Sequence, residues 1–263
     1  LLFDLAAREG ALLPEDIATH RFWPMVRAAA SYLVRNGPVT PQDRWEEDGG
    51  YTPYTLAAEI AALLVAAEWA EKCGQPELAP CLRETADSWN AQIERWLYVQ
   101  DTTLARSCGV EGYYVRIAEG DSDGADGIID IRNRPDDDTQ HRADEIVSAD
   151  ALALVRFGLR GADDPRIVNT VRVIDAVLKT QLPYGPAWHR YSDDGYGEHA
   201  DGSPFDGTGI GRLWPLLSGE RAHYELARGD TTTAARLQRS FEAMAGPGGL
   251  LPEQTWDTTD IPE

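Results

Sequence analysis

Residues 52–70 constrain the fold most, because they predict one long helix with almost no polar face. Thr52 suits the N-cap position and Pro53 suits the first helical turn. Apolar residues then occur on nearly every side of the helix over residues 56–67. A helix that is apolar all round is buried on most sides, and its many alanines let neighbouring helices approach closely. We therefore expect several helices to pack around this one.

The rest of the chain also has a mainly helical period. Apolar residues spaced three or four apart, together with capping residues, predict further helices at residues 20–36, 76–97, 148–159, 165–181, 210–228 and 231–245. At most two strands are expected, one of them within residues 113–117, so a fold of repeated βαβ units is disfavoured.

Long polar loops at residues 121–138 and 183–208 separate these helices. The pattern is typical of antiparallel helix hairpins, arranged either as an open solenoid or as a closed toroid. No repeat of fixed length is visible, which weakens the solenoid alternative. In a toroid the long loops gather at one end, and loops on a rigid scaffold are where binding groups usually lie.

The composition excludes several classes of function. The formal net charge is −20, from 44 acidic and 24 basic residues, so binding to nucleic acids or to anionic membrane surfaces is disfavoured. No apolar run approaches the roughly 18 residues of a membrane span. Three cysteines without a CxxC pair argue against a disulfide framework or a zinc knuckle, and structural thiols are expected. The chain begins without Met and within an expected helix, so we expect a piece of a longer protein and assign no localisation.

Paired carboxylates lie in the loop that precedes the long helix. Glu46 and Glu47 follow Trp45 and precede two glycines. Adjacent carboxylates repel each other, and an aromatic ring that excludes water favours the neutral form of one of them. A carboxyl that keeps its proton can act as a general acid. The alternative is a solvated acidic turn that stabilises the next helix through its dipole.

Two further loops combine aromatic rings with charged groups. In residues 188–198, aromatic side chains alternate with Arg190, Asp and Glu. Flat rings stack on pyranose faces, and planar charged groups hydrogen-bond sugar hydroxyls, although an ordinary loop with internal salt bridges fits equally well. In residues 250–257, Glu253 lies between Pro and Gln and near a Trp. Taken alone, Glu253 fits an exposed loop residue, and its interest comes from the other two loops.

Weaker patterns favour no cofactor. Residues 207–211 resemble a phosphate-binding turn, but no strand precedes them. The acidic residues of the 121–138 loop lack the Gly and Glu positions of an EF-hand, so calcium is possible there but is not predicted; they include Asp121, Asp123, Asp126 and Asp130. His189 and His199 are not spaced as a catalytic zinc site, and no metal site is expected.

Several longer motifs resemble one known family, the glucoamylase and glucodextranase family of glycoside hydrolases (glycoside hydrolase family 15), in its prokaryotic branch. The Arg44-Trp45-Glu46-Glu47 segment and the following helix look like the acid-bearing loop of that family. The other matching segments follow in the same order, at residues 148–152, 190–197, 211–217 and 252–256. The resemblance covers nearly the whole chain from about Phe22 onward.

The resemblance implies an all-α fold, an (α/α)6 barrel, with the long loops at the active-site end. It also implies that residues 1–263 form an incomplete catalytic domain, without the N-terminal helices of the barrel and without its last helix. The family carries an early Arg-Asp pair that grips the non-reducing glucose, and this chain has no counterpart of that pair. Activity of this chain by itself is therefore in question.

The activity that the resemblance implies is exo-hydrolysis of α-glucosidic bonds with inversion, which releases β-D-glucose from non-reducing ends. Matched by position, Glu46 is the general acid and Glu253 the general base, and their carboxyls need a separation of about 6.5–9.5 Å. The expected substrate-binding residues are Glu47, Arg190, Trp214, Trp45 and Tyr191. Because the charge of Arg44 would oppose protonation of Glu46, we expect Arg44 to turn away or to pair with another acid.

Several alternatives stay open. Relatives hydrolyse α-1,4, α-1,6 or α,α-1,1 glucosides, as glucoamylase, glucodextranase or trehalase, and the sequence does not choose among these linkages. A non-catalytic carbohydrate-binding module would keep the aromatic residues but would tolerate loss of Glu46 or Glu253. A purely helical interaction scaffold would not gather Trp45, Arg190 and Trp214 together. The expected partner is an α-glucan or α-glucoside oligosaccharide, with no required cofactor.

Overall fold

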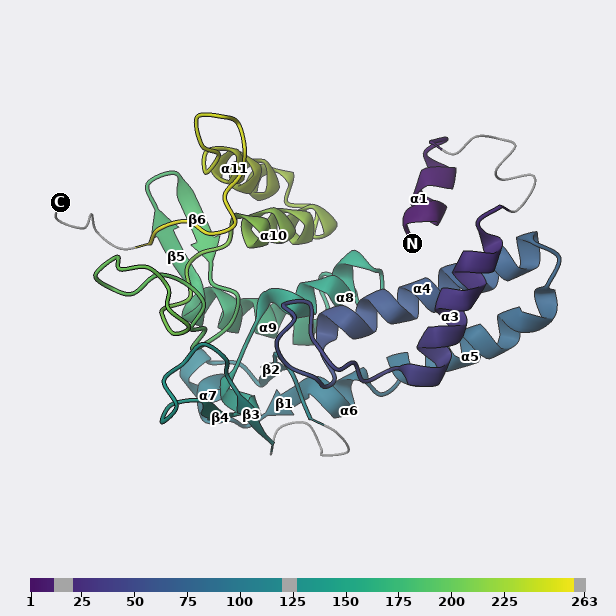
Figure 1. The fold of residues 1–263 in the computed structure, drawn as a ribbon, viewed down its shortest axis with the longest axis horizontal. Helices are drawn as coiled ribbons and strands as arrows, with labels where there is room; N and C mark the ends of the chain where they lie inside the picture. Colours follow the sequence, from purple (N-terminus) through teal and green to yellow (C-terminus); the bar gives the residue numbers. More distant parts are fainter. Residues whose placement is uncertain (12–20, 120–126, 258–263) are drawn as a thin grey trace.

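A computed structural model describes residues 1–11, 21–119 and 127–257. Most of its regular structure is helical (Figure 1). The helices are α1 Leu2–Arg8, α3 Trp23–Asn36, α4 Pro53–Lys72, α5 Ala79–Asn90, α6 Ile93–Leu97, α7 Thr103–Cys108, α8 Leu152–Arg156, α9 Pro165–Val177, α10 Pro215–Ala227 and α11 Thr231–Glu242. Short 3₁₀ turns lie at η1 Pro76–Leu78, η2 Ala143–Glu145 and η3 Ala149–Ala151. Within the described residues, no helix is both long and apolar enough to span a membrane.

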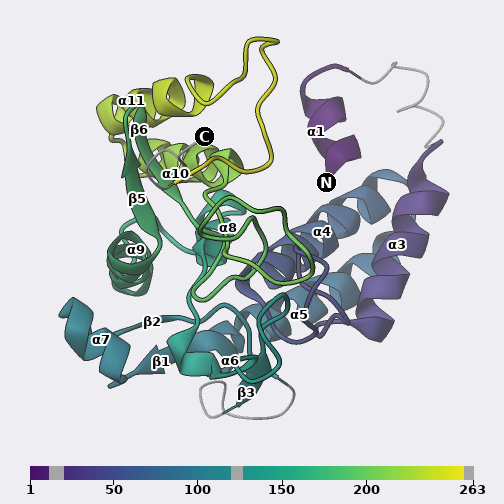
Figure 2. The ribbon, with the colours of Figure 1, turned by 60° about the vertical axis from the view of Figure 1, so that its left-hand side comes forward.

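The helices pack as neighbouring pairs. Helix α5 lies along α4, and α11 lies along α10, while the short α8 contacts both α4 and α10. Helix α3 crosses α4, and α9 packs on β2 and α7 (Figures 1 and 2). This arrangement confirms the expectation of helix hairpins around the long apolar helix.

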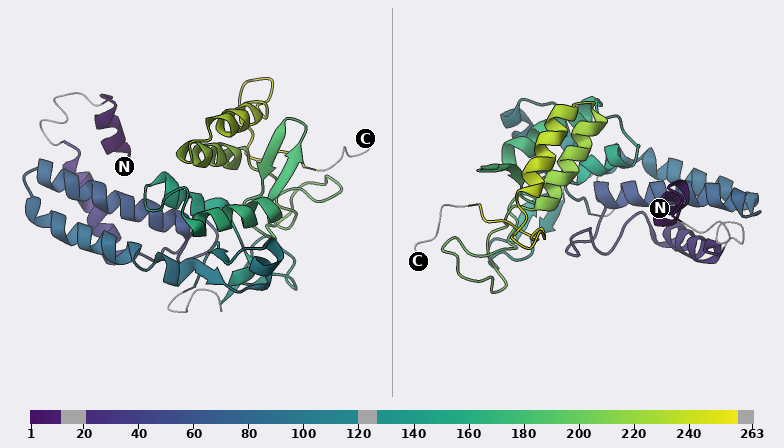
Figure 3. Two further views of the ribbon diagram at one scale, coloured as in Figure 1. Left: turned by 180° about the vertical axis from the view of Figure 1, so that it is seen from behind. Right: turned by 90° about the horizontal axis from the view of Figure 1, so that it is seen from above.

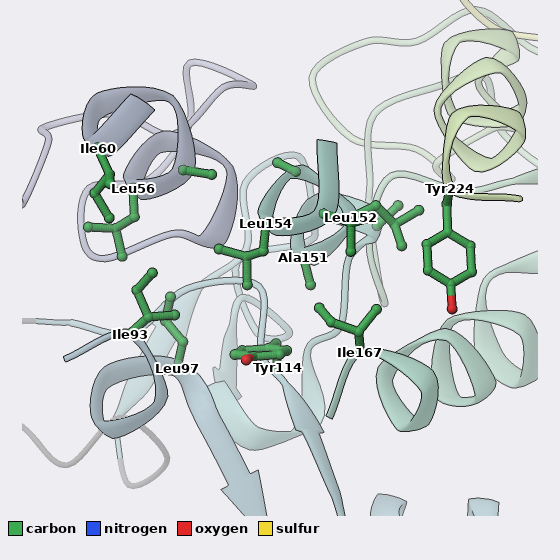
Figure 4. Close-up of a cluster of buried hydrophobic side chains, with 14 of the residues drawn as sticks. Leu56, Ile60, Ile93, Leu97, Tyr114, Ala151, Leu152, Leu154, Ile167 and Tyr224 are labelled. Atoms are coloured by element: carbon green, nitrogen blue, oxygen red, sulfur yellow. The ribbon is translucent and has the colours of Figure 1, made fainter. Parts of the chain in front are cut away.

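Helix α4 begins and is buried as its sequence predicts. Thr52 Oγ1 accepts a hydrogen bond from Thr55 N at 3.3 Å, and Pro53 occupies the first turn. Ten of its residues are buried, and Figure 4 shows side chains from α4, α6, α8, α9 and α10 meeting in one apolar cluster. The side chains labelled there include Leu56, Ile60, Ile93, Leu97, Leu154, Ile167 and Tyr224.

The expected helix over residues 76–97 is broken into three pieces. After the turn η1, helix α5 ends at Asn90 and α6 begins at Ile93. Arg160 donates to the backbone oxygen of Asn90 at 3.2 Å and to its side-chain oxygen at 2.7 Å. The prediction of one continuous helix was wrong because this tertiary contact takes the Asn90 carbonyl that would otherwise extend the helix.

Six short strands form three two-stranded antiparallel sheets in the described residues, where at most two strands were expected. They are β1 Tyr98–Gln100 with β2 Gly112–Tyr114, β3 Ile128–Asp130 with β4 Gln140–Arg142, and β5 Lys179–Leu182 with β6 Gly185–Trp188. The strand expected near residues 113–117 corresponds to β2.

The β5–β6 hairpin replaces the end of a predicted helix. Helix α9 stops at Val177 instead of continuing to residue 181. Pro183 restricts Leu182 to extended backbone. Gly185 has a φ of 137°, a backbone conformation that residues with a side chain rarely adopt. The turn residues therefore favour a hairpin, which the helical period of the preceding residues conceals.

Two other helices are shorter than predicted. The helix expected over residues 148–159 is the turn η3 followed by α8, with Ser148 Oγ accepting from Asp150 N at 3.2 Å. Helix α10 begins at Pro215 and not at residue 210. Trp214 is extended, as expected for a residue before proline, and this extended segment contributes to the site described next.

Candidate active site

The loop before α4 holds Glu46 in an unusual backbone conformation. Glu46 has a φ of 61°, in the left-handed region that few non-glycine residues occupy. Asp43 supports this turn, because its Oδ1 accepts from Trp45 N at 3.0 Å and from Glu47 N at 3.2 Å. Glu46 N donates to the Asp43 backbone oxygen at 3.1 Å. The side chain of Glu46 is exposed, whereas those of Asp43 and Glu47 are buried.

Arg116 is the buried cation beneath this loop. Its side chain is 0% exposed, and its guanidinium donates to Asp43 at 2.7 Å, Glu47 at 3.2 Å and Asp48 at 2.8 Å. The guanidinium carbon lies 3.8 Å from the centre of the Tyr191 ring. A buried charge with this many partners fixes the loop in one arrangement, because breaking any of the pairs leaves an uncompensated charge.

Glu47 connects this loop to the loop after β6. Glu47 Oε1 accepts from Arg190 Nη2 at 2.8 Å, and Oε2 accepts from the Tyr191 hydroxyl at 2.6 Å. Burial raises the pKa of Glu47 above its ordinary value, although Arg190, Tyr191 and Arg116 each oppose that rise. Both Glu47 and Tyr191 are buried, and Tyr191 is only 1% exposed.

Arg190 lies at the centre of an aromatic cluster. Asp194 binds its guanidinium through two contacts of 2.6 and 2.7 Å. The guanidinium carbon is 5.2 Å from the Trp45 ring, 5.3 Å from the Trp214 ring and 5.1 Å from the Tyr196 ring. Burial lowers the pKa of Arg190, but Asp194 and Glu47 more than compensate and raise it overall. Within the described residues, Nη1 of Arg190 has no hydrogen-bond acceptor.

The loop that carries Glu253 reaches the same cluster through Leu213. Thr255 N donates to the Leu213 oxygen at 2.8 Å, and Leu213 also forms an isolated antiparallel bridge with His189. The next residue, Trp214, meets Trp45 edge-on with ring centres 5.0 Å apart. Glu46 and Glu253 are both exposed; the loop of Glu46 contacts Trp214, and the loop of Glu253 bonds the adjacent residue Leu213. In Figure 3 the loops before α4, after β6 and after α11 lie on one side of the helices.

Arg212 is a buried arginine that holds the Glu253 loop. Its side chain is 1% exposed, and its guanidinium binds Asp257 at 2.6 Å. It lies 4.1 Å from the Trp256 ring and donates to the backbone oxygens of Glu198 and His199 at 2.7 and 2.8 Å. The Glu253 loop is thus fixed by an arginine, as the loop of Glu46 is fixed by Arg116.

Comparison with known proteins identifies the scaffold that carries these two loops. The family model described as "Glycosyl hydrolases family 15" matches residues 6–262. The chain belongs to glycosyl hydrolase family 15. It is 42% identical over 238 residues to a glucoamylase from Clostridium sp. (strain G0005), a match that covers 90% of this chain and 33% of the relative.

Solved structures agree with this family 15 membership. A crystal structure of a bacterial glucoamylase complexed with acarbose superposes with a TM-score of 0.84 at 40% identity, covering 93% of this chain and 35% of that one. A structure described as "Glycosidase Wild Type" shares the fold alone, with a TM-score of 0.58 at 21% identity over 86% of this chain and 48% of that one. The expected (α/α)6 barrel is thereby confirmed as the fold class. The chain spans about a third of the length of the glucoamylases it matches.

In this family 15 chain, Arg44 turns to other acids, as its position next to the Glu46 loop led us to expect. Its guanidinium binds Glu220 at 3.0 and 3.1 Å and Asp150 at 3.3 Å. The expected substrate-binding residues Trp45, Arg190 and Trp214 are brought together around the Arg190 guanidinium.

Four residues that hold the site loops in place were not predicted from the sequence. These are Asp43, Arg116, Asp194 and Arg212, all of them buried. The signal for Arg116 is visible in retrospect, because a single arginine follows three residues of an apolar strand segment. Buried arginines need carboxylate partners, but one sequence does not say which carboxylates they are.

No group of three or more His, Cys, Asp or Glu side chains suited to a metal ion occurs in the part of the chain that the structure describes. Asp121, Asp123 and Asp126 of the acidic loop lie outside the described residues. Asp130 ends strand β3 and is exposed.

Proposed function

We propose that this chain carries both catalytic carboxylates of an exo-acting, inverting α-glucosidase that releases β-D-glucose from non-reducing ends of α-glucans. The observation that carries the proposal is that Trp45 of the Glu46 loop contacts Trp214, while Thr255 of the Glu253 loop bonds the adjacent residue Leu213. The 40% identical bacterial glucoamylase in complex with acarbose supports an oligosaccharide substrate. The 42% identical clostridial glucoamylase supports the same class of reaction.

In this mechanism Glu46 donates a proton to the glycosidic oxygen as the bond to the leaving group breaks. Glu253 removes a proton from a water molecule that attacks the anomeric carbon from the opposite face. The two carboxyls of an inverting pair are about 6.5–9.5 Å apart, which leaves room for that water. The exposed side chains of both residues suit groups that must contact substrate and solvent.

The aromatic cluster supplies the proposed sugar-binding groups. Nη1 of Arg190 has no protein acceptor within the described residues and is the proposed donor to sugar oxygens. The Nε1 atoms of Trp45 and Trp214 also lack an acceptor there, but they are buried and their rings are what the cluster offers to a sugar. Glu47 orients Arg190, and its Oε1, which accepts from Arg190, has a second lone pair for a further hydrogen bond, whereas Oε2 already accepts from Tyr191 and Arg116. The buried Tyr191 hydroxyl holds Glu47 in place.

The test follows the anomer that the full-length protein releases from maltose and from isomaltose, by NMR. Release of β-glucose from maltose supports the glucoamylase assignment, and preferential release from isomaltose supports the glucodextranase alternative. Release of α-glucose would contradict an inverting mechanism. Binding of maltose without turnover would favour a non-catalytic carbohydrate-binding module.

A further inference from the structure

Four charged side chains form a closed cluster beside the acid-bearing loop. We call Arg44, Asp150, Arg156 and Glu220 the Arg44 cluster. Arg44 binds both oxygens of Glu220, at 3.0 and 3.1 Å, and Asp150 Oδ1 at 3.3 Å, while Arg156 binds Glu220 Oε1 at 3.3 Å. Two positive and two negative groups thus meet with little exposure at Arg44, Asp150 and Glu220.

The Arg44 cluster restrains both the position and the orientation of the loop that carries Glu46. The guanidinium carbon of Arg44 lies 4.1 Å from the centre of the Tyr54 ring and 4.6 Å from the centre of the Trp45 ring. Two-point binding to Glu220 sets the plane of the guanidinium, which a lysine ammonium cannot reproduce. The backbone two residues before Glu46 is therefore tied to η3 and to α10, elements more than a hundred residues away.

Further charged groups complete the surroundings of the cluster. The charges of Asp43 and Arg116 also act on Asp150, and His223 Nδ1 lies 2.9 Å from Arg156 Nη2. Burial raises the pKa of Asp150 to about 6, with Arg44 opposing the rise. Within the described residues Asp150 Oδ2 has no hydrogen-bond partner. Asp150 therefore binds Arg44 through one oxygen, whereas Glu220 binds it through both.

We propose that Glu220 and Asp150 are positioning residues for the general acid, which hold the Arg44 charge away from Glu46 and keep its loop in the productive turn. This inference rests on the proposed role of Glu46. An uncompensated Arg44 would favour the carboxylate form of Glu46 and would remove the proton that it must donate. Nothing in the Arg44 cluster touches the reacting atoms in this account, so its effect is exerted through Arg44 and the backbone.

The experiment compares kcat/KM against pH for variants of the full-length protein on maltose. The basic limb of a bell-shaped profile reports loss of the proton from the general acid. Glu220→Gln should move that limb to lower pH by ~0.5 unit or more, because Arg44 then carries excess positive charge. Arg44→Met should move it to higher pH, and the double variant R44M/E220Q should return it toward the original position.

Arg44→Lys separates charge from position. It keeps the positive charge but loses two-point binding and stacking, so the limb should stay in place while kcat falls by ~10-fold or more. Glu84→Gln, on the exposed side of α5, is the matched control for removal of one negative charge and should leave the profile unchanged. Thermal unfolding of each variant checks that it is folded at the assay temperature.

The outcomes distinguish this inference from the proposed function. Limbs that coincide for E220Q, the double variant and the parent would overturn the positioning role of the Arg44 cluster. If Arg44→Met leaves too little folded protein, E220Q and the double variant still test the positioning role. The double variant removes one positive and one negative charge, so it leaves no uncompensated charge of that pair. If Glu46→Gln affects good and poor leaving groups equally, the role of Glu46 itself fails, whatever the limbs do.

Discussion

At Glu46 the backbone is held in a conformation that costs a non-glycine residue about 1–3 kcal/mol. Asp43 and Arg116 supply the hydrogen bonds and the charge that hold the turn in this conformation. Strain that is maintained by buried partners is found most often where function needs one geometry. The turn directs one carboxylate outward while it buries the next, so two adjacent glutamates acquire different surroundings.

Replacement of Glu46 by Gln tests acid catalysis directly. Gln cannot donate the proton, so turnover of glucosides with poor leaving groups should fall by about 100-fold or more. Glucosides with activated leaving groups need little protonation and should lose much less. The measurement is kcat/KM for a series of aryl glucosides of graded leaving-group pKa with the full-length protein. A uniform loss across the series would contradict the assignment.

The buried carboxyl of Glu59 should make the stability of the folded protein depend on pH. It lies on α4, is 6% exposed, and its Oε2 has no hydrogen-bond partner within the described residues. Burial raises the pKa of Glu59 from 4.5 to about 7. The folded state therefore keeps this proton to higher pH than the unfolded chain. Stability is lost as pH rises from the unfolded pKa toward the folded one, and the loss is complete above about pH 7.

Glu59→Gln should accordingly be more stable than the parent at pH 8, by about 1–2 kcal/mol after allowance for solvent screening. At pH values well below 4.5 the two should be equal, because Glu59 is then protonated in both states. Urea unfolding at a series of pH values measures the difference. A constant difference at every pH would show that Glu59 does not titrate on unfolding in this range.

At the scale of single elements, the sequence located helix boundaries best where a capping residue precedes a proline. Thr52 with Pro53 and Asp164 with Pro165 mark the starts of α4 and α9, and each capping side chain accepts a backbone hydrogen bond there. The end of α5 depends instead on a distant group. Arg160 takes the carbonyl of Asn90, and no local pattern around residue 90 indicates this.

The cap at Thr52 gives a prediction for α4. Thr52→Ala removes the bond from Thr55 N to the side-chain oxygen and should lower the free energy of unfolding by about 1 kcal/mol. Because Thr52 directly follows the acid-bearing loop, the same variant should also lower kcat. Ser88→Ala, at an exposed position of α5, is the control and should change stability by less than about 0.5 kcal/mol. Urea unfolding measures both, and equal stability of the two variants would argue against the cap.

At the scale of the whole molecule, the family resemblance carried most of what could be predicted about the site. The helical period predicted hairpins of helices but did not decide whether they form a solenoid or a toroid. The aromatic and acidic loops suggested sugar chemistry, yet only the order of several motifs predicted that Glu46 and Glu253 belong to one site. The buried arginines stayed hidden because their partners lie far along the chain, as Arg116 and Glu47 do.

The net charge of −20 gives a prediction for the whole chain. Mutual repulsion of surface carboxylates destabilises the compact state. Raising NaCl from about 0.01 to 0.1 M shortens the Debye length from about 30 to 10 Å, so the urea midpoint at pH 7 should rise. Buried pairs such as Arg116 with Asp43 are screened much less. The rise should shrink at acidic pH as carboxylates lose their charge, and a fall with salt at pH 7 would show that surface ion pairs outweigh repulsion.

Leu213 accepts the backbone bond from Thr255 and is followed directly by Trp214, the neighbour of Trp45. In the proposed site, a short local bridge would therefore set the spacing of the two glutamates, and the long stretch of chain between them would not. Insertions or deletions elsewhere in that stretch would then reshape the surroundings of the substrate during evolution without changing the distance that the proposed inverting mechanism requires.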